Sequence, residues 1–573
     1  MTVFLSEVEK NNFLFGIIKT PKTVSYGIFD DGDTVLQLIG SPTYKAIKKK
    51  YLSGREISSG MSENGINTGL YLKTGTTSID ELFNSFLPRQ IYASRMRGRT
   101  GFYQPGGAYG FRDQLQDSLA LIYCDPSLVR THIIRCAARQ YTDGSVMHWW
   151  HDIPGYDGKN IPKGIRTRCS DDYLWLPFTV CEYINRTGDQ SVLDVEIPYL
   201  DSSLLEPHES DRYETPPFTS GKEALYFHCI RAISFLRIGP RGLPFIGSCD
   251  WNDGLSAVGS DGGTPGTGSG ESVWLAIFAC IIIKEFIPIC KSRGDIESAS
   301  LLEKKYSLLR EATEKYGWYE NGDEGFYIRA FYGDGTPIGA GDDKNCFIDL
   351  IPQAFAAMLN DPETKDRTEL AMDAVQKYLE DRNSGIVRLL TPPFGKRERD
   401  TALNDPGYIK GYPDGMRENG GQYTHAAVWA AWALYETGRY EQAYRIMMNI
   451  DPSSHDPEKY LGEPYALAGD VSANPDHPGK AGWTLYTGAA AWYYRLILEK
   501  FAGYEEHRDE FSVCPHICKS SGGFELTVNR KNTFYKINVI PSDKTEYRLD
   551  GHLSENRFEF DGKDHIIEIY VKT

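Results

Sequence analysis

Four short segments of this sequence combine glycines, aromatic rings and polar groups in the way that ligand-binding loops do. The first, residues 247–254, reads Gly-Ser-Cys-Asp-Trp-Asn-Asp-Gly. A carboxylate held against an indole in a tight turn loses part of its hydration, which raises its pKa and keeps a proton available for a leaving oxygen. Asp253 or Asp250 is therefore a candidate general acid. The alternative is an ordinary turn with a structural tryptophan, because Asp, Asn and Gly are standard turn residues.

The second segment, residues 103–117, is a glycine-rich loop that leads into an expected helix. Arg112 and Asp113 lie where this helix begins, and such a pair can grip neighbouring sugar hydroxyls through charge-assisted hydrogen bonds. A helix cap by Asp113 is the alternative interpretation. Three arginines precede the loop in an otherwise acidic chain: Arg95, Arg97 and Arg99.

The third and fourth segments are residues 417–425 and 482–488. Each places a hydroxyl, an imidazole or bare glycine backbone where a helix is expected to begin. Free N–H groups and the helix dipole favour an anion at such a position. Together the two segments can hold a phosphate, whereas a histidine such as His425 taken alone is more often a cap or a core residue.

The composition describes a folded, acidic chain. Hydrophobic residues make up 41% and charged residues 24% of the 573 residues, which is ordinary for a globular protein. The net charge of -16 argues against nucleic acid and against an anionic membrane as partners, because both attract clustered Lys and Arg. Aromatic residues reach 13%, which suits contacts with sugar rings, although core packing accounts for many of them.

The chain carries no pattern that predicts export or metal binding. Acidic residues stand where a signal peptide has a basic segment followed by an apolar one. The longest apolar run, residues 273–283, is too short to span a bilayer, so we expect a buried helix. The 11 cysteines include no Cys-x-x-Cys pair, as in a reducing compartment, and Cys514 and Cys518 around His516 are interpreted as incidental. We expect a cytoplasmic protein without a metal.

A repeated pattern of apolar helix-like segments and Gly/Pro/Asp-rich loops runs from about residue 88 to 500. Paired helices that each bury one apolar stripe predict an α/α barrel with its loops gathered at one mouth. Two long loops, residues 259–270 and 402–421, are of the kind that carries binding sites. Helices are expected at residues 113–139, 172–185, 221–236, 272–290, 300–316, 367–379, 424–437, 441–448 and 486–500.

Both ends of the chain have strand-like patterns. Residues 510–573 alternate apolar and polar positions between Asn, Gly and Asp turns, which is typical of a small β domain. The start of the chain also reads as short strands, with no strong helix before residues 78–86. We therefore predict a mainly α protein in four parts: a β-rich segment at 1–77, a helical linker at 78–100, a barrel at 101–505 and a β domain at 506–573.

The four segments resemble motifs of the cellobiose and chitobiose phosphorylase family, glycoside hydrolase family 94. The likeness covers residues 81–573 and is strongest to the branch of 1,2-β-oligoglucan phosphorylases and the C-terminal domain of cyclic β-1,2-glucan synthases. It includes an additional motif at residues 270–274, Gly-Glu-Ser-Val-Trp. The resemblance implies an N-terminal β-sandwich, a helical linker, an (α/α)6 barrel and a small C-terminal β-sheet domain.

The resemblance also implies a role for individual residues. Asp253 becomes the general acid, and Glu418 and Trp483 belong to matched motifs that contact substrate. The donor glucose is expected at Arg112 and Asp113, with Asp250 and Trp251 shaping its subsite, and Tyr412 corresponds to an acceptor-subsite tyrosine. The phosphate site corresponds to Arg99, His425, Thr487 and Gly488.

Two departures from the family pattern bear on the expected substrate and on the expected domain organisation. Cellobiose-type members carry a further donor-site arginine in the glycine loop, where this chain has Gly106, Gly107 and Ala108, and this difference favours the oligoglucan branch. In addition, the large N-terminal β-sandwich does not fit before residue 81. We therefore expect a fragment, a naturally short member or one half of a split enzyme, either as a homodimer or with a partner chain that supplies the sandwich.

The expected activity is inverting phosphorolysis of a β-glucoside, with β-1,2-linked gluco-oligosaccharides as substrate. Phosphate is itself a nucleophilic anion, so one carboxylic acid is enough. The products are α-glucose 1-phosphate and a shortened acceptor, with inorganic phosphate as co-substrate and no cofactor. Three alternatives are an α/α-barrel hydrolase with Glu418 as base, a non-catalytic sugar-binding subunit, and transglycosylation within a larger glucan synthase.

Overall fold

The computed structural model describes residues 2–8, 13–19, 24–29, 68–97, 107–154, 160–341, 345–395, 404–485 and 488–573. The chain divides into two compact units, Met1–Glu63 and Asn64–Thr573. In the first unit, β1 (Thr2–Val8), β2 (Phe13–Lys19) and β3 (Val24–Phe29) form an antiparallel sheet in that order. The second unit contains all the described candidate site residues.

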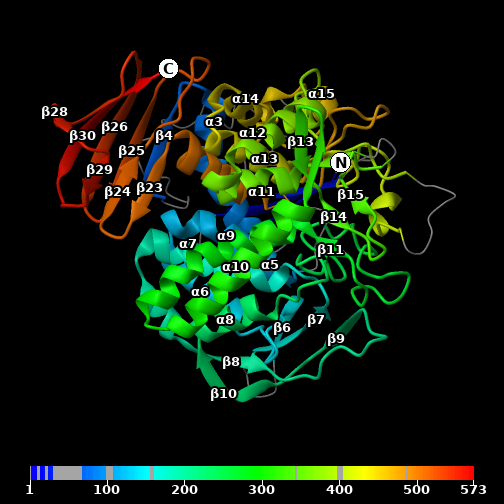
Figure 1. Ribbon diagram of the computed structural model, residues 1–573. Helices are drawn as coiled ribbons and strands as arrows, with labels where there is room; N and C mark the ends of the chain where they lie inside the picture. Colours follow the sequence, from blue (N-terminus) through cyan, green and yellow to red (C-terminus); the bar gives the residue numbers. More distant parts are fainter. Residues whose placement is uncertain are drawn as a thin grey trace. The chain divides into compact units, whose positions relative to one another are not determined.

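A ring of helices forms the centre of the second unit (Figure 1). Its members are α5 (Phe111–Ser118), α7 (Trp175–Thr187), α9 (Val273–Ser292), α11 (Leu350–Leu359), α13 (Thr424–Glu436) and α16 (Ala489–Arg495). Each helix contacts the next one in this order, and α16 contacts α5, so that the ring is closed. The residues of α13 are buried from Thr424 to Tyr435, as expected for a helix with neighbours on all sides.

A second set of helices packs outside the ring and alternates with the first set along the chain. These helices are α4 (Leu87–Gln90), α6 (Pro126–Ala137), α8 (Leu225–Phe235), α10 (Ile296–Tyr316), α12 (Lys365–Ala374) and α14 (Tyr440–Ile450). They contact α16, α5, α7, α9, α11 and α13, respectively. α10 is amphipathic and buries a stripe that includes Leu302 and Leu309, while Leu301 and Leu308 are exposed.

The helix predicted from the long apolar run is α9. By length and composition it is the one helix among the described residues that is long and apolar enough to cross a membrane. However, 67% of its apolar window is buried inside the protein, and it packs against α7, α10 and α11. Its hydrophobicity is therefore accounted for by its place in the ring, as the sequence predicted.

Inner helices begin directly after very short strands. β5 (Tyr109–Gly110), β11 (Glu271–Ser272), β16 (Ile348–Asp349) and β20 (Gln422–Tyr423) lead into α5, α9, α11 and α13. Side chains cap two of these helix starts, because Ser272 accepts from the N–H of Leu275 and Asp349 accepts from that of Ile351. The strands add to small sheets around these helix starts, so the chain is held firmly where each inner helix begins.

The remaining short strands belong to the loops between the helices. β6 (Met147–Pro154), β7 (Asn160–Thr167) and β9 (Asp211–Glu214) extend β5 into a four-stranded sheet. Further small sheets contain β8 (Glu196–Leu200), β10 (Phe218–Ala224), β12 (Trp318–Asn321), β13 (Glu324–Tyr327), β14 (Ala330–Phe331), β15 (Pro337–Ile338), β17 (Glu380–Asp381), β18 (Ile386–Val387), β19 (Leu390–Thr391), β21 (Asp470–Val471) and β22 (Ala481–Gly482).

The C-terminal sheet takes its last strand from the beginning of the second unit. Its order is β28-β27-β30-β26-β25-β4, and β4 (Leu70–Lys73), blue in Figure 1, pairs antiparallel with the orange β25 (Phe524–Arg530). The remaining strands are β26 (Thr533–Ser542), β27 (Glu546–Leu549), β28 (His552–Ser554) and β30 (Asp564–Lys572), beside a smaller sheet of β23 (Tyr504–His507), β24 (Glu510–Val513) and β29 (Arg557–Glu559).

The predicted boundaries differ from the structure at several points. Residues 70–73 had been assigned to the N-terminal segment, but they join the C-terminal sheet, because the pattern of a strand does not reveal its distant partner. The linker expected at 78–100 is helical from Thr77 to Arg97 and packs on the ring, where Phe83 stacks on Tyr494 with ring centroids 4.6 Å apart.

Two helix predictions also change, and one inner helix was not predicted. Residues 221–224 belong to β10, so that α8 begins at Leu225. The helix expected at 113–139 is interrupted before α6, where Asp125 accepts from the N–H of Leu128 and Pro126 begins a new helix. α11 was not predicted, because its apolar run is short and contains Pro352, which the first turn of a helix accommodates.

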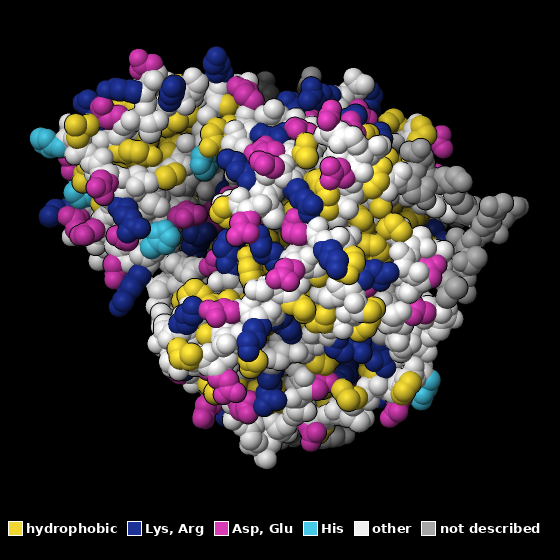
Figure 2. Space-filling view, in the orientation of Figure 1, with side chains coloured by type: hydrophobic (Ala, Val, Ile, Leu, Met, Phe, Trp, Pro, Cys, Tyr) yellow, Lys and Arg dark blue, Asp and Glu magenta, His cyan; other side chains and the backbone are white. Residues whose placement is uncertain are grey.

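Charged side chains of both signs are interspersed on the face shown in Figure 2.

Candidate active site

The candidate site lies where the inner helices begin. Arg112, in the first turn of α5, contacts Asp171, which lies just before α7. His425, in the first turn of α13, lies against Gly488, directly before α16. Contacts between residues at the starts of different inner helices show that these helix starts gather at one place. Their free N–H groups and dipoles favour negative charge there.

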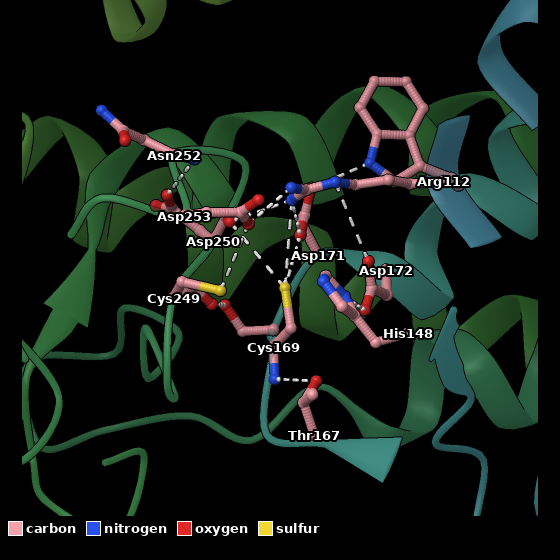
Figure 3. A network of polar contacts seen from close by, with 12 residues as sticks. Arg112, His148, Thr167, Cys169, Asp171, Asp172, Cys249, Asp250, Asn252 and Asp253 are labelled. Carbon is pink, nitrogen blue, oxygen red and sulfur yellow. Dashed lines mark hydrogen bonds and ion pairs between the residues drawn. The ribbon is translucent and has the colours of Figure 1, made fainter. Parts of the chain in front are cut away.

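Arg112 is the central side chain of the site (Figure 3). It is buried, and its Nη1 donates to Asp171 Oδ1 and to the backbone carbonyl of Asp250, both at 3.0 Å. Its Nη2 donates to Asp253 Oδ1 at 2.5 Å. Burial lowers the pKa of the guanidinium, but the charges of Asp253 and Asp171 outweigh this effect and hold it well above its ordinary value. Arg112 therefore remains a cation at the centre of the site.

Asp253 and Asp113 are the open carboxylates among the predicted site residues. About two fifths of each side chain is exposed, 41% for Asp253 and 40% for Asp113. Asp253 lies in a tight turn in which Gly254 N donates to Asn252 Oδ1 at 3.0 Å. Both carboxylates can therefore meet a ligand from solvent, and the roles predicted for them remain predictions.

Asp250 has a different environment, because its carboxylate is fully buried. Arg329 donates to both of its oxygens, at 2.5 and 2.7 Å, and Ser272 donates to Oδ2 at 2.8 Å. Arg329 Nε also lies 3.4 Å from Asp349 Oδ2, at the start of α11. Asp250 thus anchors the loop that carries Asp253, and the predicted role of Asp250 at a donor subsite stays a prediction. The sequence reasoning missed Arg329, since nothing local marks it.

Trp251 and His425 pack together on the other side of this loop. The two rings meet edge-on, with centroids 5.5 Å apart, and Trp251 meets Tyr423 in the same way at 5.3 Å. His425 also contacts Trp429, with ring centroids 4.4 Å apart. Burial lowers the pKa of His425 to about 3, so the imidazole is neutral at neutral pH. Its Nε2 is buried and has no hydrogen-bond partner among the described residues.

Gly488 lies between His425 and Asp117. A Cβ atom at Gly488 would stand 2.8 Å from His425 Cε1 and 2.9 Å from Asp117 Oδ1, so only glycine fits without a shift. Asp117 Oδ1 is buried and has no hydrogen-bond partner in the described part of the chain, while Oδ2 accepts from Arg95 Nε. Burial raises the pKa of Asp117 to about 7, although Arg95 opposes the shift. Asp117 Oδ1 therefore lies beside this glycine without a partner among the described residues, and the neighbouring His425 ring carries a second such atom, Nε2.

Arg95 is the described arginine that belongs to this corner of the site. Besides Asp117, it lies 3.8 Å from Asp113 Oδ2, and its charge helps to lower the pKa of His425 after the larger effect of burial. The sequence analysis assigns the phosphate-site arginine to Arg99, the last of the three arginines Arg95, Arg97 and Arg99. Arg99 and Thr487 lie outside the described residues.

Arg417 contacts residues of both the third segment, residues 417–425, and the fourth, residues 482–488. Its guanidinium donates to both oxygens of Glu418, at 3.1 and 3.2 Å, and lies 4.3 Å from the ring centroid of Trp483. The Tyr412 ring centroid is 5.5 Å from it. Burial, followed by the charge of Glu418, raises the pKa of Tyr412, and Asp253 contributes as well. Tyr412, Glu418 and Trp483 therefore lie in one cluster that extends to Asp253.

A group before α7 was missed by the sequence reasoning. His148 Nδ1 lies 2.7 Å from Asp172 Oδ2, and this charge raises the pKa of the imidazole well above its ordinary value despite burial. Cys169 Sγ lies 3.2 Å from Asp171 Oδ1. The Cys-Ser-Asp-Asp run at 169–172 is a polar segment before a helix, which could have drawn attention to it. Cys169 forms two sets of potential metal ligands, with His148 and Asp172 and with Cys249 and Asp253.

Comparison with known proteins decides the family. Residues 64–503 match the model of the glycosyl hydrolase 94 superfamily, catalytic domain. The chain belongs to this family. The family assignment agrees with the resemblance carried by the four sequence segments, each of which contributes described residues to the site.

Two curated relatives in the family 94 comparison illustrate its range. The chain is 37% identical over 481 residues to the cyclic beta-(1,2)-glucan synthase NdvB of Rhizobium meliloti (strain 1021), covering 83% of this chain and 16% of that protein. It is 26% identical to the N,N'-diacetylchitobiose phosphorylase of Vibrio proteolyticus, covering 82% of this chain and 57% of the relative. The chain thus spans about half of the phosphorylase and a much smaller part of the synthase.

A third relative within family 94 has a different substrate in its name. It is the 3-O-beta-D-glucopyranosyl-beta-D-glucuronide phosphorylase of Paenibacillus borealis, which is 27% identical over 82% of this chain and 57% of the relative. Family membership is therefore compatible with several sugars, and the choice among them rests on residues around the site.

Proposed function

We propose that this chain is the catalytic part of an inverting glycoside phosphorylase. It transfers a glucosyl group from a β-glucoside to inorganic phosphate and releases α-glucose 1-phosphate. The ring of inner and outer helices is then the (α/α)6 barrel of such an enzyme. One observation carries the proposal: the open carboxylate of Asp253 shares its site with an anion-compatible corner at His425 and Gly488.

In the proposed reaction, Asp253 protonates the leaving glycosidic oxygen while a phosphate oxygen attacks the anomeric carbon from the opposite face. The bond from carbon to the leaving oxygen breaks as the bond from carbon to phosphate forms, which inverts the configuration. Arg112 donates to Asp253 Oδ1, so Oδ2 is the oxygen that is left to present a proton to the leaving group.

The phosphate is held by backbone and neutral side-chain donors in this proposal. The neutral imidazole of His425 can donate from its buried nitrogen, and the N-terminus of α16 presents N–H groups beside Gly488. Arg95, paired with Asp117, supplies positive charge nearby. These groups position a nucleophile that already carries its charge, so the site needs no second carboxylate as a base.

The hydrolase alternative is less well supported, because it needs Glu418 as a base for water. Glu418 is largely buried, and Arg417 donates to both of its oxygens. A carboxylate held in this way is a positioned acceptor for a sugar hydroxyl more readily than a proton acceptor for water.

We further propose β-1,2-linked gluco-oligosaccharides as the substrate. The relative at 37% identity is named for a β-(1,2)-glucan. The acceptor is expected beside Tyr408 and Tyr412, whose ring centroids are 6.0 Å apart and whose hydroxyl pKa values respond to Asp253 after the larger effect of burial.

The test is a panel of β-1,2-, β-1,3- and β-1,4-linked glucose oligosaccharides, each incubated with and without inorganic phosphate. Release of α-glucose 1-phosphate from the β-1,2 series, only when phosphate is present, is the expected result. An Asp253→Asn variant should be inactive, whereas Asp323→Asn, in an exposed turn between β12 and β13, serves as the matched control. Free glucose released without phosphate would replace the proposal by hydrolysis.

A further inference from the structure

Two thiols lie beside the carboxylate of Asp253. Cys169 and Cys249 are both buried, and their sulfur atoms and a carboxylate oxygen of Asp253 all lie within 4.8 Å of one another. Cys249 Sγ is 3.6 Å from Asp253 Oδ1. Figure 3 shows the sulfur atoms turned toward the cluster of Arg112 and Asp253. The proposed phosphorolysis uses neither thiol.

The backbone holds the two cysteines in place. Ser170 N donates to the Cys249 carbonyl at 2.9 Å, and Ser248 N donates to the Arg168 carbonyl at 3.0 Å. These bonds tie the segment around Cys169 to the turn that carries Cys249. Gly247 allows the close approach, because a Cβ atom there would stand 2.0 Å from the Arg168 carbonyl oxygen. The backbone bonds between these two segments therefore bring the thiols together, although the two cysteines are 80 residues apart in sequence.

We propose that Cys169, Cys249 and Asp253 form a binding site for a soft divalent metal cation of the Zn²⁺ or Cd²⁺ class. Thiolates select such metals, and a carboxylate completes a set of three protein ligands. The fourth position is open to water, because the Asp253 side chain is 41% exposed. On binding, the two thiol protons are released to solvent.

The hydrogen bonds of Arg112 determine which of its contacts a bound cation would replace. The guanidinium donates to Asp253 through Nη2 only, while Nη1 is held by Asp171 and by the Asp250 carbonyl. A metal bound by these three ligands displaces the Arg112 bond to Asp253, and it also replaces the thiol hydrogen bonds of Cys169 to Asp171 Oδ1 at 3.2 Å and of Cys249 to Asp253 Oδ1 at 3.6 Å. Arg112 stays anchored through Nη1. The metal also occupies the carboxylate that the proposed function needs as an acid. Binding itself does not depend on that function, but inhibition does.

The other ligand set around Cys169 is less suitable. His148 Nδ1 is held by Asp172 at 2.7 Å, and the Asp172 carboxylate is buried and also lies 4.0 Å from Arg112 Nε. A cation there would have to break the contact between His148 and Asp172, and the most exposed ligand of that set, His148, is 23% exposed, compared with 41% for Asp253. The set that includes Asp253 therefore has the more open ligand.

The direct test is a titration of the purified, reduced protein with Cd²⁺, followed by the ultraviolet charge-transfer absorption of cadmium thiolates. Wild type is expected to show an absorption that saturates with the site, and Cys169→Ser and Cys249→Ser should each lose it. The matched control is Cys514→Ser, because Cys514 is the exposed cysteine. This control should keep the absorption, and circular dichroism checks the fold of each variant.

Two further measurements keep the proposal testable if a serine variant does not fold. X-ray absorption of the Zn²⁺-loaded wild type should show sulfur neighbours at about 2.3 Å. Zn²⁺ should also abolish glycosidic cleavage, and a chelator should restore it. A zinc environment of nitrogen and oxygen alone, or a cadmium absorption that follows Cys514, would overturn the site. Binding without any effect on activity would overturn only its link to the reaction.

Discussion

Arg112 Nη2 and Asp253 Oδ1 are 2.5 Å apart, so the residue expected to supply the proton is held by a cation from a distant part of the chain. Asp253 comes from a loop between α8 and α9, and Arg112 comes from the first turn of α5. The contact links the acid loop to the ring of helix starts. The expected effects of the Asp253 and Arg112 variants depend on this contact.

Asp253→Asn should remove the general acid and keep the fold, since the side chain is open and an amide oxygen can still accept from Arg112. We expect the turnover of a β-glucoside to fall by about 10²–10⁴-fold. β-Glucosyl fluoride needs no proton for its leaving group, so its phosphate-dependent conversion should be largely spared. Initial rates with both donors test this, and equal losses on the two would contradict the assignment.

Arg112→Met should destabilise the protein, because it leaves the buried carboxylate of Asp171 without its cation. Removing one partner of a buried ion pair costs about 3–5 kcal/mol. The control is Arg130→Met in α6, whose pair with Asp189 is partly exposed and is worth about 0–1 kcal/mol. Urea unfolding monitored by fluorescence measures both variants. Similar losses in the two would show that the Arg112 network does not behave as a buried unit.

Gly488→Ala should weaken phosphate binding specifically. The added methyl group would meet His425 and Asp117 at less than 3 Å, in the corner proposed for the anion. We expect the KM for phosphate to rise while the KM for the sugar donor changes little. Gly221→Ala is the control, since a Cβ there meets open space. A rise in the donor KM with an unchanged phosphate KM would move the anion elsewhere.

Asp117 should give the stability of the protein a characteristic pH dependence. Burial raises its pKa from the ordinary value of 3.8, which applies to the unfolded chain, to about 7 in the folded protein. The folded state therefore binds more protons between these values. The stabilisation is complete below pH 3.8 and is lost as the pH rises toward 7, at up to about 1.4 kcal/mol per pH unit.

The measurement is the difference in unfolding free energy between wild type and Asp117→Asn at a series of pH values. This difference should decrease as the pH rises from 4 to 7 and stay level above that range. A difference that increases with pH would show that the ion pair with Arg95 outweighs burial, which would make Asp117 an ordinary paired carboxylate.

His425 should act with the opposite sign. Burial lowers its pKa from 6.5 to about 3, so the unfolded state binds more protons between these values. Its contribution is present above pH 6.5 and is lost as the pH falls toward 3. His425→Gln should therefore make the protein less sensitive to mild acid, as measured by the melting temperature between pH 5 and 7. An unchanged pH profile would contradict a buried, neutral imidazole.

Most of the helices and the four candidate segments could be predicted from the sequence, because both depend on residues that are close together in the chain. Helix periodicity and the run of apolar residues in α9 are local properties. The chemistry at Asp253, Arg112 and His425 is also concentrated in short, glycine-bounded segments. Sequence reasoning failed where the pattern was short or ambiguous, as in α11 with its early Pro352, and at β4, whose partner strand lies more than 450 residues away.

By itself, the sequence determined which segments bury an apolar stripe, which loops carry chemistry and which family the chain resembles, because each of these is written in residues close together in the chain. Only the tertiary structure decided that Arg329 neutralises Asp250, that Asp171 holds Arg112, and that Asp117 and His425 face one glycine. These partners come from different helix starts. They meet because the ring of helices closes, and closure is a long-range property that no local pattern contains.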